Sequence, residues 1–404
     1  MRVSTHLIFQ RGVESMQARQ SSLLDTQQRL ATGRRMLSPA DDPVAASRAV
    51  ETAQARALNA GHIQSQGYAR DRLALVDSAL GAVTDLLSQV RAVVLLGGNG
   101  ALNGADRASL ATELETRRAE LLALANSRDG ANEFLFAGHA EAVQPFADGP
   151  GGAVVYAGDQ GRRELAIAPG RALQVTENGT EIFMRVRRGN GVFAIAPGPA
   201  NAGTGVASAG TVTDYAALTN ADYRLVFTVA GGVTTYDVID TTTWTTVSSG
   251  NVYTSGQSIA FAGMRFEITG APANGDTFAV TRSGTQSVFD TIDAAIAALR
   301  SPIATDADRA RLAQDVAHAL VDLDRALDRV LEVRTAAGAR LREVEAAGVA
   351  ASHLAIHHAG RLSELQDLDF AQAASDFARE QQALEAARVA FQRMTSVSLF
   401  DYLG

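Results

Sequence analysis

The chain of 404 residues contains no cysteine, so disulfides, thiolate metal sites and a cysteine nucleophile are excluded. Residues 1–6 lack the apolar core and cleavage site of a secretory signal, and we expect no apolar stretch of about 20 residues that could span a bilayer. The formal net charge is −8, without a long basic run, which makes nucleic acid a poor partner. Any export is therefore expected to proceed without a cleaved signal and without membrane insertion.

Proline is scarce, and its positions divide the chain. The nine prolines leave residues 44–144 and 303–404 free of helix breakers, and both stretches are rich in good helix formers. This pattern predicts helices over 5–31 and 43–96, with Asp42 as N-cap of the second. A third helix is expected to begin at Asp106 or Ser109. A long helical segment with a bend is expected over residues 306–395.

The middle of the chain has a different pattern. From residue 134 to about 283, short runs of alternating polar and apolar residues are separated by glycine-containing turns, as in 223–229 followed by Gly231 and Gly232. We predict an all-β module at 140–284, with one or two subdomains and a linker near residues 195–210.

Both chain ends carry an apolar repeat of seven residues. A seven-residue period makes a narrow helical stripe that requires a partner helix. We predict that these stripes form an assembly interface, although an intramolecular core would give the same pattern. The polar Gln20 and Gln27, offset by four residues, favour the interface. The predicted interface residues are Phe9, Met16, Leu23, Leu30 and Leu37 near one end, and Phe370, Phe377, Leu384, Phe391 and Met394 near the other.

The predicted fold class is α+β, an elongated antiparallel helical bundle or coiled coil built from both chain ends, with an all-β module inserted in the middle. Since the β module is an insertion, the helices before and after it are expected to pack side by side. The predicted domains are terminal coiled-coil segments at 1–42 and 362–404, a helical rod at 43–139 and 285–361, and the β domain at 140–284.

Candidate catalytic and ligand sites are absent from the pattern. His353 and His357 have the spacing of a zinc pair, but the segment lacks the glutamate of a metalloprotease helix. Trp244 lies near Tyr236 and Tyr253 in sequence, and we expect it to pack in a small β core rather than to bind a sugar. We therefore predict no enzyme activity, no catalytic residue, no cofactor and no metal.

Several motifs resemble those of the bacterial flagellar hook-associated protein 3 family, the hook–filament junction proteins, which are related to flagellin. Residues 30–46 read LATGRRMLSPADDPVAA, and residues 333–341 read VRTAAGARL. Similar agreement is found in LQDLDFA at 365–371, SLFDYL at 398–403, FLFAG at 134–138 and YAGDQG at 156–161.

This resemblance implies a structural subunit that polymerises through its terminal helices in a helical ring. The implied partners are hook-associated protein 1 and flagellin, and before assembly a cytoplasmic export chaperone and the flagellar type III export apparatus. The implied location is extracellular, at the hook–filament junction. Two alternatives stay open: flagellin itself, and a lectin or glycan-acting enzyme in a β domain carried on a helical stalk.

Overall fold

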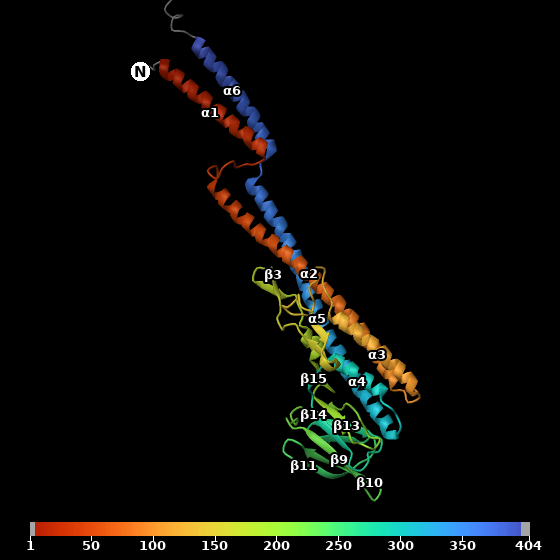
Figure 1. The fold of residues 1–404 in the computed structure, drawn as a ribbon. Helices are drawn as coiled ribbons and strands as arrows, with labels where there is room; N and C mark the ends of the chain where they lie inside the picture. Colours follow the sequence, from red (N-terminus) through yellow and green to blue (C-terminus); the bar gives the residue numbers. More distant parts are fainter. Residues whose placement is uncertain (1–4, 397–404) are drawn as a thin grey trace, which may run out of the picture. The chain divides into compact units, whose positions relative to one another are not determined.

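The computed structural model describes the backbone of residues 5–396 and the side chains of residue 7 and residues 9–393 (Figure 1). The described chain divides into two compact units. Unit 1 contains the described parts of residues 1–66 and 346–404, and unit 2 contains residues 67–345. Residues 398–403, which carry one of the motifs, lie outside the described residues. Helices at both chain ends with an antiparallel β module between them confirm the predicted α+β class.

Six α-helices are present in residues 5–396, and their boundaries follow local signals. The Asp42 carboxylate accepts the Ala45 N–H at 2.9 Å, which confirms the predicted N-cap. The third helix begins earlier than predicted, because Asn103 rather than Asp106 is its N-cap, and Asp106 completes a capping box. The helices are α1 (Thr5–Thr32), α2 (Pro43–Gly97), α3 (Gly104–Ala125), α4 (Val288–Arg300), α5 (Asp306–Gln366) and α6 (Phe370–Ser396).

The strands form one five-stranded antiparallel sheet, a smaller sheet and three two-stranded pairs. The five-stranded order is β11-β10-β9-β14-β6; β13 pairs with β12, β7 and β8; the pairs are β1-β2, β3-β4 and β15-β5. The bounds are β1 (Phe146–Asp148), β2 (Val154–Tyr156), β3 (Glu164–Ala168), β4 (Arg171–Gln174), β5 (Val186–Arg187), β6 (Phe193–Pro197), β7 (Val206–Ala207), β8 (Thr211–Val212), β9 (Tyr223–Ala230), β10 (Val233–Asp240), β11 (Thr245–Val252), β12 (Ser258–Phe261), β13 (Met264–Thr269), β14 (Thr277–Arg282) and β15 (Thr285–Gln286).

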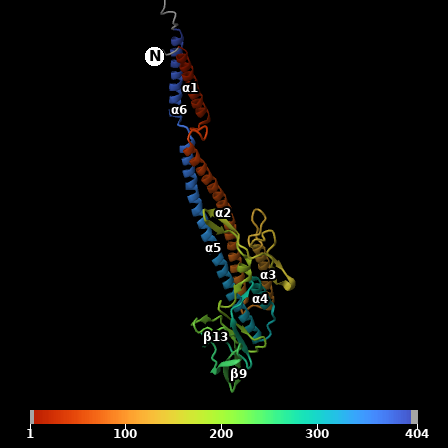
Figure 2. The same cartoon turned by 90° about the vertical axis from the view of Figure 1, so that its left-hand side faces the viewer.

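In unit 1, α1 and α6 run antiparallel and lie side by side in both views (Figures 1 and 2). The carboxyl-terminal part of α5 lies beside the amino-terminal part of α2. Asn59 on α2 is buried and donates its amide N–H to the Ala351 carbonyl at 2.8 Å. Unit 1 is thus made of two helix pairs joined by short connections.

Unit 2 has a helical core. Many apolar residues of α2 in this unit are fully or almost fully buried, although Leu75, Leu95 and Leu96 are exposed. Helix α3 lies beside α4, and Arg300 forms an ion pair with Glu115 at 2.8 Å. One part of α2 is apolar and long enough to cross a membrane by length and composition alone, so the expectation of no such stretch was wrong. Core helices pass the same test, and 39% of this apolar stretch is buried. The apolar side chains of α2 that face the protein interior include Leu73, Val76, Leu80, Val83, Leu87 and Val90.

The largest β sheet belongs to a subdomain with its own core, which includes Leu225, Phe227 and Phe278. Residues 195–210 are not the linker that was predicted. Ile195 in β6 and Ala207 in β7 are 4% and 2% exposed and belong to this core. Small residues in this segment therefore reflect close packing rather than flexibility.

Three polar side chains of α5 attach the β subdomain to the helical part of unit 2. The buried Gln314 amide donates to the Ala207 carbonyl at 3.0 Å and accepts the Ala207 N–H at 2.6 Å. His318 Nε2 lies 2.7 Å from Gln314 Nε2, and Asp322 accepts the Gly189 N–H at 2.8 Å. Burial, assisted by the positive charge of Arg188, lowers the pKa of His318 to about 4. The ring is therefore neutral at pH 7 and accepts the Gln314 hydrogen bond.

Trp244 does not pack in the core as predicted. It lies in the turn between β10 and β11 with φ of 55°, and 71% of it is exposed. The Asp240 carboxylate holds this turn by accepting the N–H groups of Thr242 and Thr243 at 2.7 and 3.0 Å. Tyr236 and Tyr253, in contrast, pack against the β core.

Candidate functional site

The two seven-residue stripes lie along the α1–α6 pair of unit 1. Phe9 and Phe391 contact each other with ring centroids 5.2 Å apart. A side chain at Gly12 would place its Cβ within 2.7 Å of the Phe391 ring, so glycine permits this close approach. Both chain ends therefore meet within one molecule, as the intramolecular alternative required.

The contact between α1 and α6 covers these stripes only in part. Met16, Leu23 and Leu30 on α1 are half-buried, whereas Gln20 and Gln27 are exposed. On α6, the predicted residues Phe377, Leu384 and Phe391 are half-buried as well. Two helices alone leave one side of each apolar side chain open, because a closed core requires neighbours on every side.

The ends of the predicted stripes are the most open. Phe9 and Phe370 are 51% and 58% exposed, and Leu37 lies in the α1–α2 connection with 37% exposure. Met394 lies in α6, but its side chain is outside the described part of the chain. Leu24, which the seven-residue pattern did not select, is 52% exposed. The pair thus presents apolar surface to its surroundings.

Backbone hydrogen bonds fix the register of the two stripes. Arg35 donates its backbone N–H to the Gln366 carbonyl at 2.8 Å, and Leu368 donates to Gly33 at 3.0 Å. Gly33 has φ of 66°, the left-handed conformation that ends α1. These bonds join the α1–α2 connection to the α5–α6 connection.

The Ser38–Asp42 part of the motif forms a turn that side-chain hydrogen bonds hold in place. Asp41 accepts the backbone N–H groups of Leu37 and Ser38 at 2.8 and 3.1 Å. These two bonds lower the pKa of the Asp41 carboxyl below its ordinary value. The next carboxylate, Asp42, caps α2, so the two aspartates have separate structural roles.

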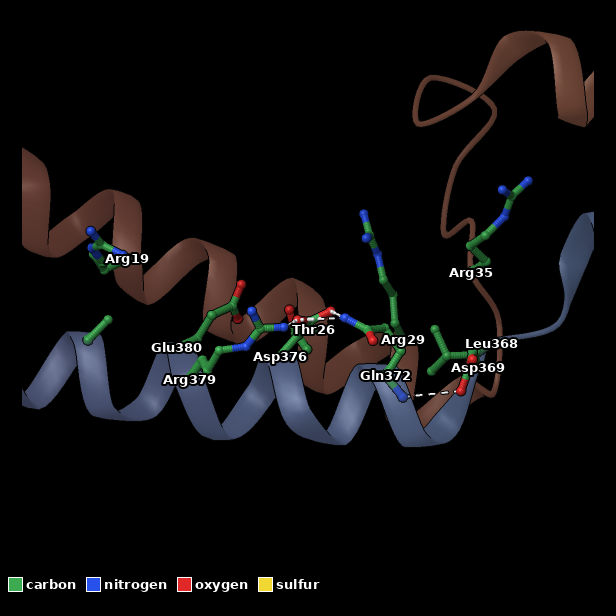
Figure 3. Close-up of a pocket in the computed structure, with 12 residues that line it drawn as sticks. Arg19, Thr26, Arg29, Arg35, Leu368, Asp369, Gln372, Asp376, Arg379 and Glu380 are labelled. Atoms are coloured by element: carbon green, nitrogen blue, oxygen red, sulfur yellow. Dashed lines mark hydrogen bonds and ion pairs between the residues drawn. The ribbon is translucent and has the colours of Figure 1, made fainter.

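A charged cleft of about 570 Å³ lies between α1 and α6 (Figure 3). Arg19 and Arg29 line it from α1, opposite Arg379 and Glu380 of α6. Ser22 donates its hydroxyl to Glu380 Oε1 at 2.7 Å, while Glu380 Oε2 and Arg29 Nε are buried without a hydrogen-bond partner among the described residues. Opposite charges along one pair of helices suit recognition of another polar helix surface.

On the α2 and α5 parts of unit 1, seven further apolar side chains are exposed, and the seven-residue pattern did not indicate them. They occupy more than one helical face, although Val349 and Ile356 are seven residues apart and Val44 and Leu58 are fourteen apart. Apolar residues around a whole helix are typical of a helix enclosed on all sides, a signal that could have identified them. They are Val44, Val50, Leu58, Ile63, Val349, Leu354 and Ile356, which are 39–72% exposed.

No cluster of three or more potential metal ligands is found among the described residues. His357 and His358 are neighbours with ring centroids 6.0 Å apart. The terminal helices therefore present apolar and charged surface rather than a set of ligands.

The comparisons with known proteins identify the class first. The family model of the bacterial flagellin N-terminal helical region matches residues 3–141. The chain therefore contains a flagellin-like amino-terminal helical region.

More specific relatives cover most of the chain. Flagellar hook-associated protein 3 of Escherichia coli K12 is 26% identical over 402 residues, 99% of each chain. The crystal structure of FlgL from Xanthomonas campestris has 32% identity and a TM-score of 0.72, covering 77% of this chain and 99% of that one. The flagellar junction protein FlgL of Legionella pneumophila has 29% identity and a TM-score of 0.71, covering 79% and 100%.

This chain belongs to the flagellar hook-associated protein 3 (FlgL) family. The predicted family and the main functional interpretation, a structural component of the flagellar hook–filament junction, are thereby confirmed over flagellin and over a stalked lectin or enzyme.

Proposed function

We propose that this chain is the adaptor subunit that connects the hook-associated protein 1 zone to the flagellin filament, and that it polymerises in a helical ring. The observation that carries the proposal is the incomplete burial of the two stripes in unit 1. Fully burying a Leu or Phe side chain stabilises a protein by roughly 1.5–3 kcal/mol, and much of that gain is available only when neighbours cover the open sides.

The assembly interface proposed here has two parts. The first comprises the ten residues predicted from the sequence, from Phe9 to Leu37 and from Phe370 to Met394. The second comprises the exposed apolar residues on α2 and α5 of unit 1. Sister subunits cover both parts in the ring, and the charged cleft beside Arg29 and Glu380 selects the register between neighbours.

The location and partners follow from membership in an extracellular assembly. The chain is exported without a cleaved signal by the flagellar type III apparatus, with a cytoplasmic chaperone before assembly, and it acts as a non-catalytic component. The absence of cysteine supports passage through a narrow channel, since no disulfide can form to obstruct it. Hook-associated protein 1 and flagellin are the partners on either side.

Single charges placed in the stripe test the proposed interface. Leu30→Asp and Leu384→Asp introduce a carboxylate at half-buried positions, so we expect each variant to be exported but not incorporated, and cells to lose motility. Ser21→Asp, at an exposed position of the same helix outside the two stripes, is the matched control and is expected to assemble normally. Normal filaments in cells producing either leucine variant would show that the stripe is not the interface.

Labelling separates an adaptor from a filament subunit. Immunogold particles against this chain are expected in a thin zone at the filament base on intact flagella. Labelling along the whole filament would contradict the adaptor role.

A further inference from the structure

A cleft of about 580 Å³ opens at one end of the five-stranded sheet in unit 2. The registers place the beginnings of β6 and β9 and the finish of β14 at this end, because Arg282 pairs with Phe193 and Val280 pairs with Tyr223. The loop at residues 218–221, just before β9, contributes to its wall. Pockets for small molecules typically measure about 300–1,000 Å³, so the size suits a small ligand rather than a folded partner.

The charge of this cleft is of one sign. Arg187 of β5 and Arg282 of β14 line it, and no acidic residue does. Both side chains are exposed, and neither guanidinium forms an ion pair within the described chain. Asp222, which lies outside the lining, accepts the backbone N–H of Arg282 at 3.1 Å rather than its guanidinium.

A second cleft in unit 2, of about 430 Å³, contains arginine side chains whose charges are paired with carboxylates. There Arg325 pairs with Asp328 at 3.2 Å and Arg329 pairs with Glu332 at 2.8 Å. Arg187 borders both clefts, but only the larger one lacks carboxylates. The protein thus leaves two positive charges available at the larger cleft.

The remaining lining combines an apolar base with polar groups. Phe193, Met264 and Val280 are 2%, 5% and 1% exposed, so only small parts of these core side chains reach the cleft. Asn220 and Ser283 add an amide and a hydroxyl to the lining. A ligand that matches these features has an apolar face, several hydroxyl groups and one anionic group.

We propose that this cleft binds a carboxylated sugar of the hexuronate type. The guanidinium groups of Arg282 and Arg187 hold the sugar carboxylate, and the polar side chains bind ring hydroxyls. The half-buried Val192 and Leu218, which also line the cleft, receive one face of the pyranose ring. This binding goes beyond the role in the flagellar junction and does not depend on the interface in unit 1.

The test is a calorimetric titration of the purified full-length chain with D-glucuronate at low ionic strength. Saturable binding to one site is expected. Arg282→Gln and Arg187→Gln each remove one charged partner, so each variant is expected to bind about tenfold more weakly. Arg162→Gln removes an exposed arginine outside the cleft and is the matched control, with unchanged affinity expected.

Three further ligands define the specificity: D-glucose lacks the carboxylate, and acetate and inorganic phosphate lack the sugar ring. Each is expected to bind at least about tenfold more weakly than glucuronate. The proposal is overturned if glucuronate gives no saturable heat, or if Arg282→Gln binds it as tightly as the unmodified chain while circular dichroism shows both to be folded. Acetate or phosphate binding as tight as glucuronate would also overturn it, because the cleft would then be a plain anion site.

Discussion

Units 1 and 2 differ in what they bury. In unit 2, Leu80, Val83 and Phe136 are fully buried, and Phe136 contacts Phe183 edge-to-face with centroids 5.6 Å apart. In the described part of unit 1, the buried residues are all alanine or side-chain amides: Ala45, Ala49, Asn59, Gln66, Ala351 and Ala373. Leucine and phenylalanine are present in both units, but only unit 2 encloses them. Apolar content alone therefore does not distinguish a core from a docking surface; the number of neighbours does.

The largest expected effect is the loss of unfolding free energy when a leucine of unit 2, rather than one of unit 1, is truncated to alanine. Leu80→Ala leaves a cavity in the core of unit 2 and should lower its free energy of unfolding by about 2–5 kcal/mol. Leu30→Ala, at a half-buried position, should leave unit 2 unchanged. Urea unfolding with hydrogen exchange at unit 2 amides measures both. Equal losses of the unfolding free energy of unit 2 in the two variants would show that the two units do not differ in how they bury leucine.

Acid should weaken unit 2 through His318. Its pKa of about 4 in the folded protein lies below the ordinary 6.5, so the unfolded chain binds the proton first as the pH falls. The stability that depends on the neutral ring is complete above pH 6.5 and decreases between pH 6.5 and 4, by about 3 kcal/mol in total. Thermal unfolding across this range is the measurement. His318→Gln should show a smaller decrease with acid, and an identical pH profile would contradict the role of the ring.

Two glycine-to-alanine substitutions in unit 1 are expected to have opposite effects on stability. Gly33→Ala forces a side chain into φ of 66° and should destabilise the α1–α2 connection, and with it the hydrogen-bonded link to the α5–α6 connection, by about 1 kcal/mol. Gly61→Ala adds a methyl group to the α2 interior with no atom within 4 Å, and should stabilise the helix by about 0.5–1 kcal/mol. Exchange of the Leu368 amide, which donates to Gly33, reports the first change. Faster exchange in the Gly61 variant instead would be inconsistent with this assignment.

The smallest effect is expected at Asn59. Asn59→Ala removes a buried hydrogen bond to Ala351 and should lower the stability of the α2–α5 pair in unit 1 by about 1 kcal/mol. Gln54→Ala, at an exposed position of α2, is the control. Exchange of amides near residue 351 should rise only in the Asn59 variant.

Local signals were readable from the sequence, and non-local ones were not. The cap at Asp42, Pro43 at the first helical position and the left-handed Gly33 predicted the helix boundaries, because each depends on neighbours within a few residues. The period of the two stripes indicated that the terminal helices need a partner, and the structure pairs them with each other. The start of α3 was misplaced because Asp106, a good cap, acts here as the N3 residue of a capping box whose N-cap is Asn103.

Features that depend on distant contacts were missed. Ala207 joins a core because Gln314, 107 residues away, binds both of its backbone groups. Trp244 is exposed because the Asp240 turn projects beyond the sheet core, which composition does not reveal. The exposure of Val50 or Ile356 likewise depends on how many helices surround each position. The assembly residues themselves stay a prediction.

The hydrogen bonds between the α1–α2 and α5–α6 connections of unit 1 also constrain the order in which the terminal helices can pair. Arg35 donates its guanidinium N–H to the Leu365 carbonyl across 330 positions of sequence. A chain that emerges from a channel amino terminus first would therefore expose α1 without its companion until α6 has followed. If the proposed export and ring assembly hold, a truncated product would carry an unpaired α1 and is expected not to enter the proposed ring in the correct register.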